Sequence, residues 1–253
     1  MKEIYNAINQ IIAERKKAAM CIITETKGST PRKIGSKMIV LENGQVIGSI
    51  GGGELEHFVV EKSQEIIKTG DAETFNFGLK EDFQMSCGGR VTVFVEPVKL
   101  PDQLIVFGGG HICRSLVTYA KNFDFNITVV DEREGIFDSW AENDFTLINK
   151  IHIEAYPELK FDDQTYVCIM THAHKYDKIV AGYCGSQNSK FTGVIASKTK
   201  AAKIRKELIE EKVLTQEQAE AIEMPLGIPM KCELPEEIAI SVLGRLIDVK
   251  NQK

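Results

Sequence analysis

No apolar run in the sequence approaches the ~18 residues that a membrane-spanning helix needs. The first residues also lack the uninterrupted apolar core of a signal peptide, because Lys2 and Glu3 are charged. An excess of positive charge is missing too, since 31 Lys and Arg stand against 36 Asp and Glu, for a net charge of −5. We therefore expect a cytoplasmic protein that has no membrane partner and binds no nucleic acid.

None of the six cysteines forms a C-x-x-C pair, which excludes a zinc ribbon and a thioredoxin motif. In a cytosolic chain the default is a reduced thiol that is buried like a small hydrophobic residue. Cys21, Cys113 and Cys168 lie in apolar stretches and fit that default. Cys87 does not, because it is followed directly by two glycines.

Length and composition indicate an ordinary globular protein of one large or two small domains, at roughly 150 residues per domain. The chain has 253 residues, of which 43% are hydrophobic and 26% charged, so disorder is not expected. Pro97 and Pro101 lie close together and mark a linker. We expect a first domain over residues 1–98 and a second over residues 103–253.

The two parts differ in their pattern of elements. Residues 1–98 mix helices and strands without regular alternation, including a hairpin of residues 37–41 and 45–50 and a helix over 54–68, and this predicts a smaller α+β domain. In the second part, apolar strands alternate with helices. The expected strands are 103–107, 126–130, 145–148, 165–170 and 191–195, and the expected helices are 112–122, 175–184, 198–211 and 235–249. This pattern predicts an α/β, Rossmann-like parallel sheet with helices on both faces.

The run Gly108-Gly109-Gly110 leaves a buried strand and enters a helix at His111, which is the context of a dinucleotide-binding fingerprint. The first glycine permits a tight turn, and Gly110 lets a phosphate approach the helix N-terminus. About twenty residues on, Asp131 ends the next strand, where an acidic residue accepts hydrogen bonds from a ribose diol. Arg133 would instead meet a 2′-phosphate, so the nucleotide stays open.

The loop from Thr171 to Asp177 follows the fourth strand of the expected sheet and should face the same crevice as the glycine run. Its two histidines and aspartate could ligate a metal, or His172 could act as an acid or base. In the alternative interpretation, His172 and Asp177 cap and orient the loop. We expect Thr171 and His172 to line a site.

Three features of the N-terminal part each allow a functional and a purely structural interpretation. Gly51-Gly52-Gly53 indicates either close approach of a ligand or a tight strand-to-helix turn. The loop that holds Arg32 either binds a phosphate or carboxylate or is simply solvated. Cys87 is either a small turn residue or an exposed thiol that could attack or hold sulfur or metal.

Seven segments carry a resemblance that spans nearly the whole chain. The first part contributes ETKGSTPRKIGSKM at 25–38, GSIGGGELE at 48–56 and CGGRVTVFVEP at 87–97. The second part contributes LIVFGGGHI at 104–112, VVDER at 129–133, MTHAHKYD at 170–177 and PEEIAISVLGRLI at 235–247. Each alone is weakly specific, but all seven in order resemble the XdhC/CoxI family of xanthine dehydrogenase accessory factors.

The resemblance implies a maturation factor rather than an enzyme that turns over a substrate. Such factors bind and protect the molybdenum cofactor, as molybdopterin or its dinucleotide form, and assist exchange of a molybdenum oxo for a sulfido ligand. They then deliver the cofactor to the apoenzyme of a molybdenum hydroxylase such as xanthine dehydrogenase. A sulfur donor of the cysteine desulfurase type is the other implied partner, and a homodimer is expected from base rates.

By resemblance, Cys87 is the residue expected to contact the molybdenum or the incoming sulfur, and a thiolate suits a soft metal. The sequence departs from the family at Glu54, where many members carry cysteine. It departs again at Ala196 and Lys198, where glycine and arginine are usual, and at Lys231 and Cys232, where a small Gly-Ala pair is common. These last two changes lie at the expected crevice and leave its ligand open.

Two other functions compete with the maturation factor. One is an NAD(P)-dependent oxidoreductase that uses the Gly108 loop, with His172 as acid or base. The other is a nucleotide-sensing protein without catalysis. The first predicts hydride transfer and leaves the N-terminal glycine clusters unexplained, and the second predicts nucleotide binding that is independent of molybdenum.

Overall fold

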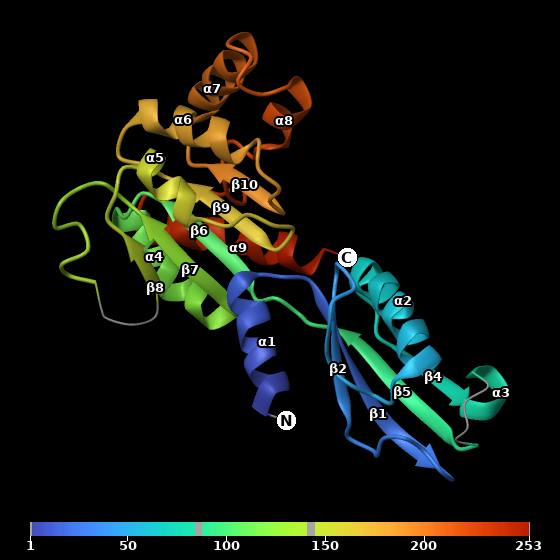
Figure 1. Ribbon diagram of the computed structural model, residues 1–253. Coiled ribbons are helices and arrows are strands. Elements are labelled where there is room, and N and C mark those ends of the chain that lie inside the picture. Colours follow the sequence, from blue (N-terminus) through green and yellow to red (C-terminus); the bar gives the residue numbers. More distant parts are fainter. Residues whose placement is uncertain (1, 84–87, 141–144, 253) are drawn as a thin grey trace. The chain divides into compact units, whose positions relative to one another are not determined.

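A computed structural model describes residues 2–83, 88–140 and 145–252, and the chain forms two compact units, Met1–Leu100 and Pro101–Lys253 (Figure 1). Each unit is built around a sheet of its own. Across the described residues, the helices are too short or too polar to cross a membrane.

The sheet of the first unit is antiparallel, with strand order β3-β2-β1-β5-β4. Its strands are β1 (Ala18–Lys27), β2 (Lys37–Leu41), β3 (Val46–Gly48), β4 (Glu73–Gly78) and β5 (Arg90–Pro97). β2 and β3 form the expected hairpin, and Gly44 has the positive φ of 83° that its turn requires. The predicted strand over 90–96 is confirmed as β5.

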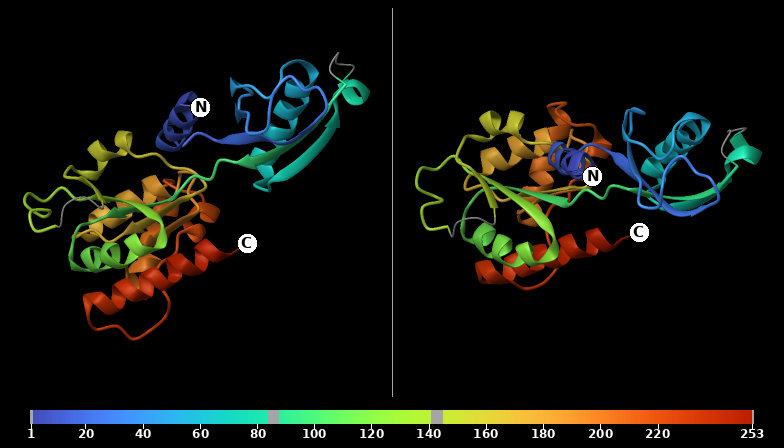
Figure 2. Two further views of the ribbon diagram at one scale, coloured as in Figure 1. Left: turned by 90° about the horizontal axis from the view of Figure 1, so that it is seen from below. Right: turned by 60° about the horizontal axis from the view of Figure 1, so that its bottom comes forward.

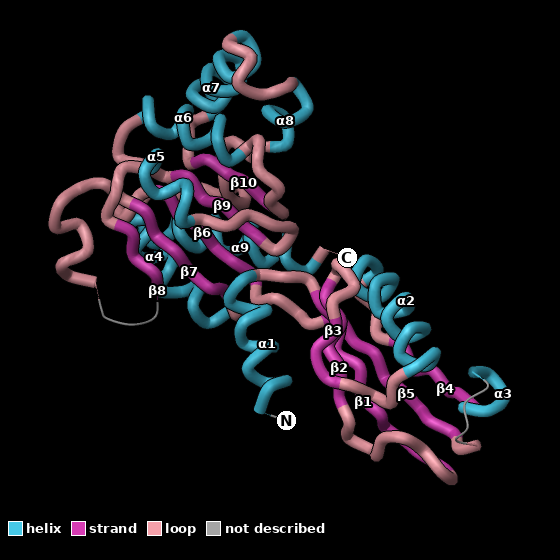
Figure 3. The backbone as a smooth tube through the Cα atoms, in the orientation of Figure 1, coloured by secondary structure: helices cyan, strands magenta, loops and turns pink. Residues whose placement is uncertain are grey.

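Three helices belong to the first unit, α1 (Lys2–Glu14), α2 (Gly53–Thr69) and α3 (Leu79–Phe83). Figure 3 shows α2 running along one face of the antiparallel sheet. Leu55, Val59 and Ile66 of α2 are buried there in one core with Val91 and Val93 of β5. The α2 helix ends at Gly70, whose φ of 80° gives the left-handed conformation that commonly ends helices.

The sheet of the second unit is parallel, with strand order β10-β9-β6-β7-β8. The strands are β6 (Asp102–Phe107), β7 (Phe125–Val130), β8 (Phe145–Ile148), β9 (Thr165–Ile169) and β10 (Phe191–Val194). The order reverses between β6 and β9, so the loops after these two strands diverge and leave a crevice at the carboxyl edge of the sheet. This is the predicted Rossmann-like arrangement.

Helices cover both faces of this sheet, as predicted (Figure 2). One face packs against α4 (His111–Ala120) and α9 (Pro235–Asn251). The other packs against α5 (His152–Ala155), α6 (His174–Cys184), α7 (Lys198–Glu210) and α8 (Gln216–Ala221). Each face therefore has a separate apolar core.

Four of these elements were not predicted from the sequence: β4, α3, α5 and α8. β4 is an edge strand in which half of the residues are exposed, and its apolar alternation is limited to Phe75 and Phe77, which is too short a pattern to mark a strand. The three helices have four to six residues, which is too short for a helical period to show.

Candidate functional site

In the glycine run after β6, the fold requires glycine at Gly108, whereas Gly110 faces open space. Gly108 has φ 109°, and a Cβ there would lie 2.3 Å from the carbonyl oxygen of Met170. Only glycine fits such a close approach. Gly110 has φ −73° at the amino end of α4, and no heavy atom lies within 4 Å of where its Cβ would be. A phosphate can therefore approach α4 at Gly110.

Asp131, at the end of β7, is buried and uses both carboxylate oxygens within the chain. Oδ2 accepts a hydrogen bond from the Gly109 amide at 2.7 Å, and Arg133 reaches Oδ1 through Nε at 2.9 Å and Oδ2 through Nη2 at 2.7 Å. Burial raises the pKa of Asp131, but the hydrogen bonds from Arg133 and Gly109 outweigh it, and the pKa is lowered from 3.8. A ribose diol could bind this carboxylate only by displacing one of these donors.

The loop after β9 is fixed by a buried carboxylate. Asp177 accepts hydrogen bonds from the amide and hydroxyl of Thr171, at 3.0 and 2.6 Å, and from Nζ of Lys200 at 2.6 Å. The side chain of Asp177 is 2% exposed and that of Lys200 is 17% exposed. Asp177 therefore orients the loop, as one of the two sequence interpretations proposed.

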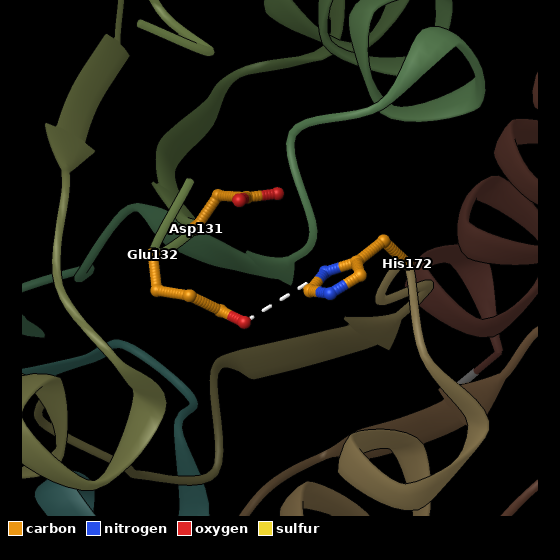
Figure 4. Close-up of side chains that lie close together, drawn as sticks. All are labelled: Asp131, Glu132 and His172. Carbon is orange, nitrogen blue, oxygen red and sulfur yellow. Dashed lines mark ion pairs between the residues drawn. The ribbon is translucent and has the colours of Figure 1, made fainter. Parts of the chain in front are cut away.

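His172 lies beside Glu132, a residue of the VVDER segment that was not singled out from the sequence as a site residue (Figure 4). The Nδ1 atom of His172 is 3.7 Å from Oε1 of Glu132. One ligand atom from each of Asp131, Glu132 and His172 lies within 4.8 Å of the others, so these three residues could hold a divalent metal. A metal here would compete with Arg133, which already balances the charge of Asp131.

A second histidine, His152, lies close by and was also missed. Its ring contacts Tyr176, with centroids 5.3 Å apart, and the centroid of the same Tyr176 ring lies 5.5 Å from that of His172. Burial lowers the pKa of His152 from 6.5, against an opposing effect of Glu132. No sequence pattern marked His152, because it lies in the four-residue helix α5.

In the first unit, Ile50, Gly51 and Gly52 form a nest of backbone amides around a carboxylate of the chain itself. Oε1 of Glu56 accepts hydrogen bonds from the amides of Ile50, Gly51 and Gly52 at 3.0, 3.1 and 2.8 Å. It also accepts one from the Ser49 hydroxyl at 2.7 Å. Burial raises the pKa of Glu56, but these hydrogen bonds outweigh it and the pKa is lowered from 4.5. The carboxylate of Glu56 therefore already occupies the anion site that these amides form.

Three N-terminal motifs meet around the loop that holds Arg32. The Gly89 amide donates to the carbonyl oxygen of Ser29 at 3.1 Å, and a Cβ at Gly89 would lie 2.3 Å from that oxygen. A Cβ at Gly51 would lie 3.0 Å from Cγ of Pro31. Arg32 itself is exposed. Cys87 lies outside the described residues.

Among the cysteines that the structure describes, four are buried and one is partly exposed. Burial raises the pKa of Cys21 to about 11, although a hydrogen bond with Ser63 lowers it. Burial also raises the pKa values of Cys113, Cys168 and Cys184. The partly exposed cysteine is Cys232. The four buried thiols stay protonated and unreactive near neutral pH.

The candidate site residues therefore fall into two groups, one in each unit. The second unit brings together Gly108, Gly109, Gly110, His111, Asp131, Arg133, Thr171 and His172 at the carboxyl edge of its sheet. The first unit brings the Arg32 loop together with the Gly51–Gly53 run.

Two family models match the chain. The model of the XdhC Rossmann domain matches residues 104–246. The model of the XdhC and CoxI family matches residues 11–78. Together they cover most of both units.

Curated proteins show further similarity. The protein named YqeB from Escherichia coli (strain K12) is 29% identical over 242 residues, which are 92% of this chain and 43% of that protein. A protein described as a probable xanthine dehydrogenase subunit, from Bacillus subtilis (strain 168), is 25% identical over 162 residues, 63% of this chain and 46% of that protein. The chain thus spans about half the length of the curated relatives it matches.

A crystal structure described as a xanthine dehydrogenase from Bacillus halodurans aligns with a TM-score of 0.53 and 20% identity. The alignment covers 98% of this chain and 96% of that one. At this identity the likeness establishes the fold alone.

Proposed function

The chain belongs to the XdhC/CoxI family, and from this premise we propose that it is a maturation factor for a xanthine dehydrogenase-type molybdenum enzyme. In this role it binds the molybdenum cofactor as cargo, in its molybdopterin or dinucleotide form. It assists sulfuration of the cofactor and delivers it to the apoenzyme. Its partners are that apoenzyme and a cysteine desulfurase-type sulfur donor, and its working form is a homodimer.

The observation that carries the proposal is the meeting of three family motifs in the first unit. The contact of Gly89 with Ser29 and that of Gly51 with Pro31 join segments that are far apart in the sequence. At Gly89 a Cβ would clash with the backbone, and at Gly51, whose φ is 146°, it would be in tight contact with Pro31, so glycine favours the close approach at both points. A nucleotide-dependent oxidoreductase does not need a second cluster of glycine-rich loops outside its Rossmann domain. The meeting of these motifs in the first unit therefore supports a second region that binds a ligand.

We assign the contact with molybdenum or incoming sulfur to the Cys87 thiol. A soft metal with dithiolene sulfurs prefers a thiolate ligand. The four buried cysteines have raised pKa values and are poor thiolate donors. Cys232 is partly exposed and therefore provides the matched control.

The carboxyl edge of the parallel sheet supports phosphate binding more than it supports an NAD(P)-dependent oxidoreductase. Gly110 faces open space at the amino end of α4, where a phosphate would be stabilised. The carboxylate that a dinucleotide ribose would need, that of Asp131, is held by Arg133. We therefore favour a cofactor phosphate at this edge of the sheet, along which Gly110, Thr171 and His172 lie.

The test is anaerobic binding of the molybdenum cofactor to the full chain, with molybdenum and pterin counted after gel filtration. We expect stoichiometric retention by the wild type and by Cys232→Ala, and at least tenfold weaker retention by Cys87→Ala. Activation of a molybdenum hydroxylase apoenzyme in the presence of a cysteine desulfurase should follow the same order. Failure of the wild type to retain cofactor would overturn the proposal, and equal retention by both variants would overturn the role of Cys87.

A further inference from the structure

A cavity of about 1000 Å³ opens in the second unit on the α6 and α7 side of the glycine run. Its lining residues come from the loops after β9 and β10, from α6 and from α7, together with Ile112 of α4. This volume is at the upper end of the range for small-molecule sites, about 300–1000 Å³. The cavity lies at the carboxyl edge of the parallel sheet, where ligands of such folds bind.

One wall of the cavity is apolar and includes a residue that the fold leaves uncovered. Met170, Ile195 and Ile204 line it together with Ile179 of α6. Ile179 is 48% exposed although it lines a concave surface. A flat ring laid on this wall would remove that apolar surface from water.

The remaining wall is rich in positive charge. Four lysines and two carboxylates line the cavity, an excess of two positive charges in a chain whose net charge is −5. Lys200 is bound to buried Asp177 at 2.6 Å, and this ion pair fixes one end of the cavity. Lys175, near the start of α6, and Lys203 of α7 also line the cavity. Nζ of Lys203 lies 3.8 Å from Oε1 of Glu207, and Lys178 forms ion pairs with Glu207 and Glu211.

The amino end of α7 also favours an anion. Its first turn carries Lys198 and Lys200 and no acidic residue, although a helix N-terminus is stabilised by negative charge. The Ser197 hydroxyl accepts one hydrogen bond, from the Lys200 amide at 3.3 Å. An anion in the cavity would meet both the helix end and the lysine side chains.

We propose that this cavity binds the phosphate ester of a flat heterocycle. The ring lies on the wall formed by Ile179 and Ile195, and the phosphate lies between Lys175, Lys203 and the amino end of α7. Both a nucleotide and a pterin phosphate have this chemistry. The choice of a pterin rests on the proposed function, whereas the choice of a ring and a phosphate rests on the apolar wall and the lysines of the cavity.

Calorimetric titration of the full chain with guanosine 5′-monophosphate (GMP) tests the proposal, with guanosine and inorganic phosphate as partial ligands. We expect GMP to bind at least tenfold more tightly than either partial ligand, and more weakly as salt is added. The variant Lys175→Glu/Lys203→Glu should weaken GMP binding at least tenfold. Lys206→Glu is the matched control, because Lys206 lies on α7 outside the cavity with its side chain 72% exposed. Ile179→Ser should weaken GMP binding without changing phosphate binding.

Retention of the molybdenum cofactor by the same variants separates the two sources of the ligand. Retention that falls in Lys175→Glu/Lys203→Glu but not in Lys206→Glu identifies a pterin phosphate, and sensitivity of GMP binding alone identifies a nucleotide. The proposal is overturned if neither GMP nor the cofactor binds to the wild type. It is also overturned if Lys175→Glu/Lys203→Glu, like Lys206→Glu, binds these ligands as tightly as the wild type does. Cofactor retention that depends on Cys87 but not on the lysines would refute the cavity and leave the proposed function standing.

Discussion

Replacement of Glu56 by alanine should destabilise the first unit by about 2–4 kcal/mol. Its Oε1 accepts hydrogen bonds from three consecutive amides and from the Ser49 hydroxyl. Hydrogen bonds to a charged group contribute about 1.5–3 kcal/mol each, but they share one oxygen and water replaces some of them, so the total is far below their sum. Glu56→Gln keeps an acceptor and loses the charge, so we expect about half the effect.

The contribution of Glu56 should depend on pH in a defined direction. Because the folded-state pKa is lowered from 4.5, the stabilisation is fully present above that ordinary value. It is lost as the pH falls through the lowered pKa, where the carboxylate becomes protonated. The difference in free energy of unfolding between wild type and Glu56→Ala should therefore be constant near neutral pH and shrink below about pH 4.5.

Urea unfolding and amide exchange of residues 48–69 measure this effect, with Glu61→Ala as the matched control. Glu61 is on the same helix, its side chain is 63% exposed, and it lies 3.7 Å from His57. Its loss should cost less than about 0.5 kcal/mol. Sulfate should restore stability to Glu56→Ala more than to the wild type, because the vacated amides form an anion site. Equal stability of the two alanine variants near neutral pH would refute the reasoning.

Three further changes test other parts of the structure. Gly108→Ala should destabilise the second unit by about 3 kcal/mol or more because its Cβ would clash with a carbonyl oxygen, whereas Gly110→Ala should stay within about 1 kcal/mol in urea unfolding. Asp177→Ala should cost about 3–5 kcal/mol, and a double-mutant cycle with Lys200→Ala should show coupling, so purely additive losses would contradict the ion pair. Since burial lowers the pKa of His152, stability should fall as the pH drops below about 6.5, and His152→Phe should flatten that slope in urea unfolding between about pH 7.5 and 5.5.

The parallel sheet was predictable from the sequence because its strands are continuous apolar runs. Residues 104–107 are all buried, and such a run followed by glycines and a helical pattern has few interpretations. The fold class and the alternation of strands and helices were confirmed. The helix α5 has too few residues to show a period, and the alternation in β4 is limited to Phe75 and Phe77, so tertiary contacts specify these elements.

The candidate site was predictable only where a local pattern encodes it. The glycine run and Asp131 have a fixed spacing, so they could be found. The sequence left open whether a ribose meets Asp131 or a 2′-phosphate meets Arg133, and it did not show that these two residues pair with each other. Glu132 and Ile179 could not be recognised as candidate site residues from the sequence, because only the fold brings Glu132 near His172 and places Ile179 at the cavity. Glu56 had a weak signal, as an acidic residue in the first turn of a helix that follows a glycine run.

The last helix has a consequence for how the protein is made. Val242 and Leu246 of α9 share a core with Leu116 of α4, and Nζ of Lys250 lies 2.8 Å from Oδ2 of Asp102 at the start of β6. The second unit therefore lacks much of the packing on one sheet face until α9 has left the ribosome. The first unit has all its strands within residues 18–97 and can fold while the rest is still being translated. During synthesis, the first unit can therefore be folded while one apolar sheet face of the second unit is still uncovered and prone to aggregation.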